Sequence, residues 1–347
     1  MRFILFCNQP YAFSILRPLE LELMQRGYAV LWYVPAVIKE SFSFLGSQST
    51  SLMEDLIGFQ SDAIFVPGND VPHYLRGVKV QVFHGLASEK KGHFRIRDYF
   101  DLYLTQGPHF TEGFNALVNM RDDVKVVETG WSKLDALFTS PPESHNRKQQ
   151  LLKEYKSQFM IVFAPTFSPK LTSATILFDV INQIADMDNV LLVCKFHDLM
   201  DKDIVKRYQE CMNKSLIVSD EIDVLPLLKM ADILISDTSS IVYEFILLDK
   251  PVVSYLSQSK NIVWENVHSI SDVLEKVREI MAGHDRKKAD RAKLKKTYHP
   301  YSDGKSSCRM IDEVERYIAN FGVPISRKIS MFRKFKVYKK YGVRSIL

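Results

Sequence analysis

Short apolar runs rich in β-branched residues alternate with longer amphipathic stretches through most of this chain. In the first part the runs are four to seven residues long, which is typical of strands covered on both faces of a parallel sheet. The stretches between them have helical spacing, as in 13–26, which stops at a glycine. This alternation predicts a doubly wound α/β domain. The expected strands are 2–6, 28–34, 63–66, 79–83, 102–105 and 124–128.

A polar segment at 139–146 then interrupts the pattern with two prolines among small polar residues, which predicts a linker. The alternation restarts after it, with strands expected at 160–163, 190–196, 216–219, 233–236 and 252–255. We therefore predict two doubly wound Rossmann-like domains, 1–140 and 147–310, followed by a helix and a basic tail over 311–347. Open parallel sheets bind ligands at the carboxyl ends of their strands, so the two domains are expected to face a common cleft.

Length and composition fit two globular domains. The chain has 347 residues, of which 46% are hydrophobic and 25% charged, and its mean hydropathy is −0.10. These values exclude a disordered or coiled-coil chain, and no apolar stretch approaches the ~20 residues that span a bilayer. The apolar start, 3–7, is too short for a signal peptide, and the four cysteines show no paired spacing. We therefore expect a cytoplasmic, reduced protein without a disulfide framework or a zinc site.

The net charge of +5 comes from one end of the chain. Residues 323–347 contain eight Lys or Arg and no Asp or Glu, and the rest of the chain carries −3. A slightly acidic body argues against nucleic acid as a partner.

The basic tail has two interpretations. Ile325, Ile329 and Phe332 have the spacing of one helical face, but Lys336 and Lys339 interrupt that face further on. The tail is either a solvated end whose first turn packs on the first domain, or a basic, aromatic segment that docks on anionic lipid. The second interpretation predicts a peripheral protein on the inner face of the cell membrane.

The sharpest candidate site follows the strand expected at 233–236, where an Asp-Thr-Ser-Ser run opens a helical stretch. Free backbone N–H groups and hydroxyls at a helix start suit a pyrophosphate. A glutamate four residues after the run lies on the same helical face, where its carboxylate could accept hydrogen bonds from two ribose hydroxyls. The alternative is a helix N-cap with nothing bound. The residues concerned are Asp237, Thr238, Ser239, Ser240 and Glu244.

His84 and Gly85 stand where the strand expected at 79–83 ends and a loop begins, which is the usual place for function in this architecture. Imidazole is the side chain best matched to proton transfer near neutral pH. Lys90 and Lys91, further along the loop, could neutralise a phosphate or contact an acceptor. The alternative is a structural histidine beside a solvated basic loop.

Weaker signals come from three other segments. Lys195 and His197 end a strand of the second domain, where a cation and an imidazole suit a transferring phosphoryl group. Thr166 follows another strand end and could line the same cleft, although an ordinary turn would look the same. Asp303 and Lys305 flank a glycine before a C-terminal helix and could contact phosphate, or could mark a helix start with nothing bound.

Several common catalytic motifs are absent from the sequence. No G-x-G-x-x-G follows the first strand, and there is no P-loop, H-E-x-x-H or G-x-S-x-G motif. NAD enzymes, P-loop NTPases, zincins and serine hydrolases therefore lose support. We assign no metal site and no cofactor, and the sequence leaves a divalent-metal requirement open.

Taken in order, these segments resemble the CDP-glycerol glycerophosphotransferases of teichoic-acid and capsule synthesis. The resemblance spans roughly residues 80–310. The motifs that carry it are Phe83-His84-Gly85, Lys90-Lys91-Gly92, Gly130-Trp131-Ser132-Lys133-Leu134-Asp135, Phe163-Ala164-Pro165-Thr166, Lys195-Phe196-His197, Leu234-Ile235-Ser236-Asp237-Thr238-Ser239-Ser240, Leu248-Asp249-Lys250-Pro251 and Asp303-Gly304-Lys305. The sequence departs from the family's pattern at Leu86-Ala87, where Thr-Pro is usual, and at Asp198, where Pro is usual.

The resemblance implies a GT-B-like fold and assigns roles to the candidate residues. It implies that His84 is the base, that His197 and the Asp237–Ser240 turn lie at the donor pyrophosphate, and that Glu244 lies at the ribose. The implied reaction moves glycerol phosphate or ribitol phosphate from a CDP-activated donor to a hydroxyl of a glycan or lipid-linked polymer, releasing CMP. Two other readings stay open: a GT-B glycosyltransferase or sugar-nucleotide epimerase that uses a UDP-sugar, and a non-catalytic binding module.

Overall fold

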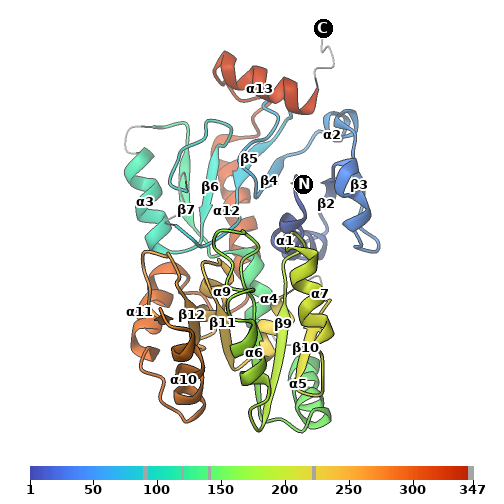
Figure 1. The fold of residues 1–347 in the computed structure, drawn as a ribbon. Helices are drawn as coiled ribbons and strands as arrows, with labels where there is room; N and C mark the ends of the chain where they lie inside the picture. Colours follow the sequence, from blue (N-terminus) through green and yellow to red (C-terminus); the bar gives the residue numbers. More distant parts are fainter. Residues whose placement is uncertain (89–92, 119–120, 140–141, 221–223, 343–347) are drawn as a thin grey trace. The chain divides into compact units, whose positions relative to one another are not determined.

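The computed structural model describes residues 1–88, 93–118, 121–139, 142–220 and 224–342, so Lys90 and Lys91 lie outside the described residues. The chain folds into two compact units (Figure 1). The first unit contains the described residues up to Phe138 and those from Tyr298 onward, and the second contains those of 139–297. The unit boundary at Tyr298 therefore differs from the boundary at 310 expected from the sequence.

The first unit is built on a seven-stranded parallel sheet in the order β3-β2-β1-β4-β5-β6-β7. The winding direction reverses between β1 and β4, and sheets of this kind bind ligands at the carboxyl ends of the strands around such a point. The one strand that the apolar pattern did not predict is β3, a short polar strand at the sheet edge. The strands are β1 (Arg2–Phe6), β2 (Ala29–Tyr33), β3 (Ser49–Thr50), β4 (Ala63–Val66), β5 (Val78–Gln81), β6 (Leu102–Thr105) and β7 (Lys125–Glu128).

Helices cover the first sheet. Alternate residues of each strand point to opposite faces, so consecutive apolar residues give the sheet apolar side chains that need cover on both faces. Ile4 and Phe6 of β1 share one apolar cluster with Val337 from the last helix. The first helix packs against the helix that begins at Ser306, and Arg26 just after it pairs with Asp312 at 2.7 Å. The helices of this unit are α1 (Phe13–Gln25), α2 (Met53–Phe59), α3 (Pro108–Val118), α4 (Asp135–Phe138), α12 (Ser306–Phe321) and α13 (Met331–Tyr341).

The second unit is built on a six-stranded parallel sheet in the order β10-β9-β8-β11-β12-β13, which reverses direction between β8 and β11. All strands expected from the sequence form, and β13 is added as a short edge strand. The strands are β8 (Phe159–Phe163), β9 (Val190–Lys195), β10 (Leu216–Ser219), β11 (Ile233–Ser236), β12 (Val252–Tyr255) and β13 (Glu265–Val267). The prediction of two doubly wound α/β domains is confirmed by the two parallel sheets.

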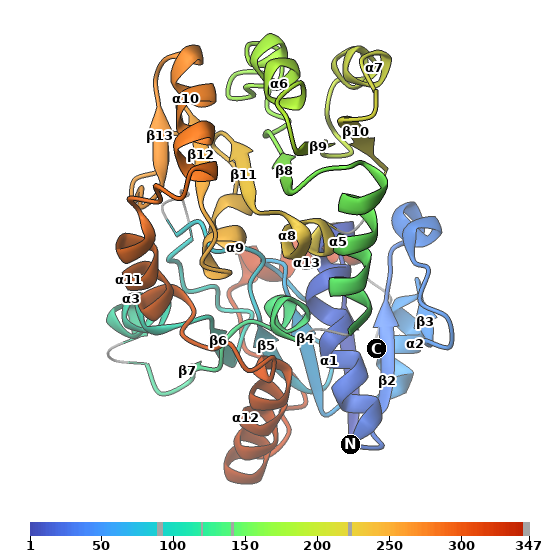
Figure 2. The ribbon, with the colours of Figure 1, turned by 90° about the horizontal axis from the view of Figure 1, so that it is seen from below.

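Helices lie on both faces of the second sheet. Figure 2 shows α6, α7 and α10 along one face and α5, α8 and α9 along the other. On the first face, Phe163 of β8 and Leu192 of β9 share an apolar cluster with Tyr208 and Val273. The helices are α5 (Pro142–Glu154), α6 (Phe178–Ala185), α7 (Lys202–Glu210), α8 (Leu225–Met230), α9 (Ile241–Leu247), α10 (Ile270–Met281) and α11 (Lys288–Tyr298).

The linker expected at 139–146 is mostly wrong, because α5 begins at Pro142. Proline is favoured at the first position of a helix, because a backbone N–H at that position would have no partner within the helix and the φ angle of proline already suits the helix. Pro142 therefore marks the start of a helix close to the boundary between the two units. Lys148 of α5 pairs with Asp232 at 2.5 Å, which fixes the helix to the start of β11.

The described part of the tail, 323–342, packs on the first unit rather than extending as a solvated end. The expected helical face of Ile325, Ile329 and Phe332 does not form, because α13 begins only at Met331. Before it, the backbone pairs with the first unit: the N–H of Gly77 donates to the carbonyl of Pro324 at 2.9 Å. Among the described residues, no helix is both long enough and apolar enough to span a bilayer.

Arg327 fixes the segment that leads to α13. Its guanidinium donates to the carbonyl of Asp98 at 2.7 Å and pairs with the carboxylates of Asp101 and Asp123. The side chains of Arg327 and Asp101 are only 8% and 6% exposed. Asp101 also accepts a hydrogen bond from the N–H of Lys79 at 2.8 Å, so one buried carboxylate joins the tail to the start of β5.

We expect Arg327→Met to lower the free energy of unfolding by about 3–5 kcal/mol, because it leaves Asp101 buried and without its cation. The double variant Arg327→Met with Asp101→Asn should recover part of this loss, since the uncompensated charge is then removed. Lys328→Met, at an exposed neighbouring position, should change stability by less than about 0.5 kcal/mol. Urea unfolding measures all three, and a cost below 1 kcal/mol for Arg327→Met would contradict the buried pair.

Candidate functional site

Three neighbouring strands of the second sheet, β9, β8 and β11, carry candidate residues at their carboxyl ends. Asp237 follows β11, at the point where the sheet reverses direction. Its buried carboxylate accepts hydrogen bonds from the N–H of Thr166 and from both the N–H and the hydroxyl of Ser173, each at 2.8 Å. Burial raises the pKa of Asp237, and these hydrogen bonds oppose the shift. Asp237 therefore ties the loop after β8 to the end of β11.

The hydroxyls that follow Asp237 differ in their partners. Thr238 accepts a hydrogen bond from the N–H of Gln258 at 3.0 Å. Ser240 is the N-cap residue of α9, but its side chain makes no capping hydrogen bond. Within the described ranges, no hydrogen bond engages the half-buried hydroxyls of Ser239 and Ser240. A helix cap alone, the alternative reading of this run, therefore does not explain the two serines. Glu244 lies buried in the first turn of α9.

His197 follows β9 with a defined ring orientation. Its Nδ1 accepts a hydrogen bond from the N–H of Leu199 at 3.1 Å, so the proton of the neutral ring is on Nε2. Partial desolvation lowers the pKa of His197, against an opposing effect of Asp198 and with a smaller contribution from Lys195. The ring packs on Phe167, with centroids 4.5 Å apart. In the neutral ring, the Nε2–H of His197 is therefore the hydrogen-bond donor. Lys195 donates to the carbonyl of Phe196 at 2.8 Å.

In the first unit, the backbone just before His84 is strained. Phe83 has φ +59°, the left-handed region that non-glycine residues rarely adopt. Gln81 holds this turn: its Oε1 accepts from the N–H of Phe83 at 3.1 Å, and its Nε2 donates to the carbonyl of Gly68 at 2.9 Å. The strained residue turns the chain out of β5 so that His84 is exposed.

The ring of His84 is oriented by the loop after β4. Its Nδ1 lies 2.9 Å from the carbonyl oxygen of Pro67, which can only accept, so Nδ1 donates and the lone pair of the neutral ring is on Nε2. Tyr11, in the loop after β1, packs beside it with ring centroids 5.4 Å apart. Gly85 is held by its carbonyl, which accepts from Nε2 of Gln106 at 3.2 Å. These contacts fix the orientation of the His84 ring and of the residue after it.

Asp303 and Lys305 belong to the first unit, whereas Asp237 and His197 belong to the second. Asp303 pairs with Arg309 at 2.7 Å and accepts from the N–H of Lys305 at 3.1 Å. The turn is positioned by Asp135, whose carboxylate accepts from the N–H groups of the first two residues of α12 at 2.8 and 2.7 Å. Lys305 itself is exposed.

Sequence reasoning missed Tyr11 and Phe167, the two rings beside the candidate histidines. Both lie in loops that directly follow strands at a reversal point, β1 and β8, so strand order would have indicated them. It also gave no role to Lys250, which donates to the carbonyls of Lys229 and Ala231 at 2.6 and 2.7 Å. Burial lowers the pKa of Lys250 to about 8, and its contacts stabilise the end of α8.

The sequence matches the model of a known protein family over residues 76–316, which is described as CDP-Glycerol:Poly(glycerophosphate) glycerophosphotransferase. This is more than half of the chain, and the chain belongs to that family. The resemblance that the ordered motifs indicated is therefore confirmed.

Two curated relatives match about half of the chain. A teichoic acid glycerol-phosphate primase of Bacillus spizizenii is 31% identical over 162 residues, which cover 45% of this chain and 40% of the relative. The teichoic acid ribitol-phosphate polymerase TarK of Staphylococcus aureus is 29% identical over 171 residues, 46% of this chain and 32% of TarK. The chain thus spans less than half the length of these relatives.

Solved structures share the fold over nearly the whole chain. The wall teichoic acid polymerase TagF aligns with a TM-score of 0.65 at 16% identity, covering 92% of this chain and 89% of that one. The UDP-bound structure of MnaA from S. aureus aligns with a TM-score of 0.66 at 15% identity, covering 92% and 97%. At these identities the likeness establishes the GT-B-like fold and nothing about the substrate.

Proposed function

We propose that the protein transfers glycerol phosphate or ribitol phosphate from a CDP-activated donor to a hydroxyl of a glycan or lipid-linked polymer. The observation that carries the proposal is the hydrogen bond from Nδ1 of His84 to the Pro67 carbonyl, in a chain of this family. This bond places the lone pair of the neutral ring on Nε2, the atom proposed to take the proton of the acceptor hydroxyl. The hydroxyl oxygen bonds to the phosphorus that bears the polyol, the bond from that phosphorus to the CMP oxygen breaks, and CMP leaves.

The second unit is proposed to bind the donor. The hydroxyls of Ser239 and Ser240 and the Nε2–H of His197 are donors suited to pyrophosphate oxygens, and they would stabilise the charge that develops on the departing CMP. Asp237 acts through the loops that it joins. Lys195 and Thr166 lie at the ends of the strands beside it, and Glu244 is the proposed ribose contact. Lys90, Lys91, Gly85, Asp303 and Lys305 remain proposed phosphate or acceptor contacts.

Incubation with CDP-glycerol, CDP-ribitol and a panel of UDP-sugars tests the reaction class. Release of CMP in the presence of an acceptor supports the proposal and identifies the polyol. Release of UDP or epimerisation of a UDP-sugar would replace it with the sugar-nucleotide chemistry known from other proteins of this fold. Nucleotide binding without any release would make the chain a binding module.

Replacing the proposed base separates chemistry from binding. We expect His84→Ala to lower the rate of CMP release by about 10²–10⁴-fold, while the affinity for CDP measured by calorimetry stays within twofold. His268→Ala, which removes an exposed histidine of the second unit, is the control and should leave both unchanged. A rate loss of less than about tenfold, or an equal loss of CDP affinity, would remove His84 from the role of base.

The two serines should matter for binding and little for stability. For Ser239→Ala with Ser240→Ala, each lost hydrogen bond to a charged phosphate should weaken CDP binding by about 1.5–3 kcal/mol. The melting temperature should stay close to the original, because neither hydroxyl has a partner inside the described structure. Ser271→Ala, at an exposed position, serves as the control. Normal CDP affinity with a much lower melting temperature would show that the run is only structural.

The tail is proposed to place the protein peripherally on an anionic membrane surface. Met331, Phe332 and Phe335 are 78%, 69% and 67% exposed on α13, in a tail that carries eight basic residues and no acidic one. Exposed apolar side chains on a basic helix are the features that bind the headgroup region of anionic bilayers. Deleting the whole tail would not test this, because Val337 and Arg327 hold the first unit together.

A double substitution on the exposed face is the better test. We expect Met331→Ser with Phe335→Ser to weaken binding to phosphatidylglycerol vesicles at least tenfold at low salt, since about 1.4 kcal/mol corresponds to a factor of ten. Transfer to a soluble acceptor should be unchanged. Leu45→Ser, which removes an apolar side chain that is 97% exposed outside the tail, is the control. Equal vesicle binding by the variant, or none by the original protein, would contradict the membrane role.

A further inference from the structure

The last helix, α13, presents three sides, of which one is packed on the sheet and another is exposed. The packed side carries Val337, and the exposed side carries Phe335. Arg333, Lys336 and Lys340 follow one another at i, i+3 and i+7, which places them along a third side. This third side faces the loop after β4 and the loop before β6.

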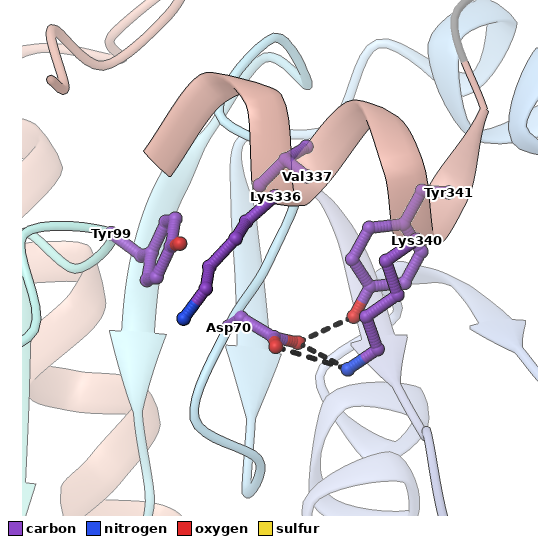
Figure 3. Close-up of a pocket in the computed structure, with 6 residues that line it drawn as sticks. All are labelled: Asp70, Tyr99, Lys336, Val337, Lys340 and Tyr341. Carbon is purple, nitrogen blue, oxygen red and sulfur yellow. Dashed lines mark hydrogen bonds and ion pairs between the residues drawn. The ribbon is translucent and has the colours of Figure 1, made fainter. Parts of the chain in front are cut away.

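Two adjoining cavities lie between α13 and these loops, with volumes of about 350 and 260 Å³. The larger is within the range of roughly 300–1,000 Å³ that is usual for small-molecule sites. Asp70, Tyr99 and Lys336 line both cavities, and Figure 3 shows Lys336 extending from α13 toward the space between the other two. Among the described residues, one carboxylate and five cationic side chains line the cavities: Asp70, with Arg95, Arg97, Arg333, Lys336 and Lys340.

The acidic groups in this region are already engaged by other partners. Asp70 pairs with Lys340 at 2.8 Å and accepts from the hydroxyl of Tyr341 at 2.6 Å, as Figure 3 shows. Asp98 pairs with Arg333 at 2.9 Å. These carboxylates therefore compensate only part of the positive charge around the cavities.

The remaining positive charge belongs mainly to Arg95 and Lys336. In the described part of the chain, neither has a carboxylate within ion-pair distance. Burial lowers the pKa of Arg97, and the nearby charges of Arg95 and Arg333 lower it further. Cations held together around a cavity favour the binding of an anion between them.

An exposed apolar surface adjoins the cationic side of the helix. Phe332 lines the larger cavity although it is 69% exposed, and the ammonium of Lys336 lies 5.1 Å from the centre of its ring. Met331 and Phe335, on the same helix, are 78% and 67% exposed. A free phosphate ion would gain nothing from this apolar border. A cationic cavity beside exposed apolar side chains is complementary to an amphiphile with an anionic headgroup.

We propose that this cavity binds the phosphate of one anionic phospholipid, whose acyl chains leave along Phe332 and Phe335 into the bilayer. The inference rests on the proposed membrane role of the tail and names the lipid group that the tail recognises. It differs from a general attraction between a basic helix and an acidic surface, which depends on total charge and holds no single lipid. Guanidinium groups bind phosphate oxygens through paired hydrogen bonds, and a lysine adds a mobile charge.

A lipid bound in this cavity would also fix the height of the proposed base above the membrane. Lys340 and Tyr341 tie α13 to Asp70, in the loop after β4. The Pro67 carbonyl of the same loop orients the ring of His84. The headgroup, the helix and the ring would therefore be held in one arrangement, which suits an acceptor that is itself linked to lipid.

Two double variants test the inference. Arg95→Gln with Lys336→Gln, the cavity variant, removes two exposed cations that form no ion pair within the described ranges. Lys328→Gln with Lys339→Gln removes the same charge from exposed positions of the tail that do not line the cavities, and is the matched control. Both variants should keep the original melting temperature.

The first measurement is a calorimetric titration with dihexanoylphosphatidate, a short-chain lipid used at concentrations where it stays monomeric, so that no bilayer is needed. We expect one molecule to bind. Its affinity should fall at least about tenfold in the cavity variant and stay within about twofold in the control. Unchanged binding by the cavity variant would overturn the site.

Two further ligands identify the source of the phosphate. Inorganic phosphate tests the anion without acyl chains, and dihexanoylphosphatidylcholine tests the chains without a net charge. Each should bind at least about tenfold more weakly than dihexanoylphosphatidate. Equal binding of inorganic phosphate would make the cavity a site for a free anion, and equal binding of the phosphatidylcholine would make it an apolar site. Either result would overturn the proposed lipid.

The second measurement is binding to vesicles of phosphatidylglycerol and phosphatidylcholine at low salt. We expect the cavity variant to lose at least about tenfold more affinity than the control. Equal losses would show that total charge alone attracts the tail, since each variant lacks two cations, and would leave the membrane role without the headgroup site. If the original protein binds no vesicles, but binds dihexanoylphosphatidate in a way that depends on Arg95 and Lys336, the membrane role fails and the headgroup site stands.

Discussion

The carboxylate of Asp237 is the contact on which the geometry of the candidate donor site depends. It accepts hydrogen bonds from the N–H of Thr166 and from the N–H and hydroxyl of Ser173, and it is almost fully buried. A buried charge is costly unless such hydrogen bonds satisfy it, so the loop after β8 has one favourable position relative to β11. Both oxygens of Asp237 are used inside the protein, whereas no hydrogen bond within the described ranges engages the hydroxyls of Ser239 and Ser240. The first unit contains a similar contact, in which the Asp135 carboxylate accepts hydrogen bonds from Ser306 and Ser307 and fixes the start of α12.

In the first unit, the loop after β4 positions several other segments, as Asp237 does in the second. Its Pro67 carbonyl sets the tautomer of His84, and its Gly68 carbonyl accepts from the side chain of Gln81, which also holds the strained turn at Phe83. A few residues later, Asp70 is bound by two side chains of α13. The orientation of the His84 ring, the strained backbone at Phe83 and the packing of the last helix are therefore linked through one short segment.

The sequence predicted the parts of the fold that apolar runs determine. Central strands such as 63–66 and 102–105 agree with the structure because burial on both faces requires consecutive apolar residues. The apolar pattern did not predict the edge strands β3 and β13, because they are short and partly polar. The segment around Pro142, the first residue of α5, resembled a linker because proline favours both turns and first helical turns. The tail was misread because pairing of its backbone at Pro324 delays the helix until Met331.

The candidate residues could be placed at strand ends from the sequence, but what orients them could not. The Pro67 carbonyl is 17 residues from His84, and Ser173 is 64 residues from Asp237. Neither Pro67 nor Ser173 can be recognised in the sequence by residue type or spacing, because each comes close to its histidine or aspartate only once the sheets have formed. The cavity beside α13 is lined by residues that are still further apart in the sequence, since Asp70 belongs to the loop after β4 and Lys340 to the last helix.

The discontinuous make-up of the first unit also limits the order in which the protein can mature on the ribosome. Its sheet is complete once residue 128 has been made, yet α12 and α13, which cover it, come from beyond Tyr298. The whole stretch 139–297, which contains the second sheet, is translated in the interval. Until the last segment emerges, apolar residues such as Ile4 and Phe6 lack the cover that Val337 later gives them. A nascent chain of this protein therefore exposes part of its first sheet throughout the synthesis of its second.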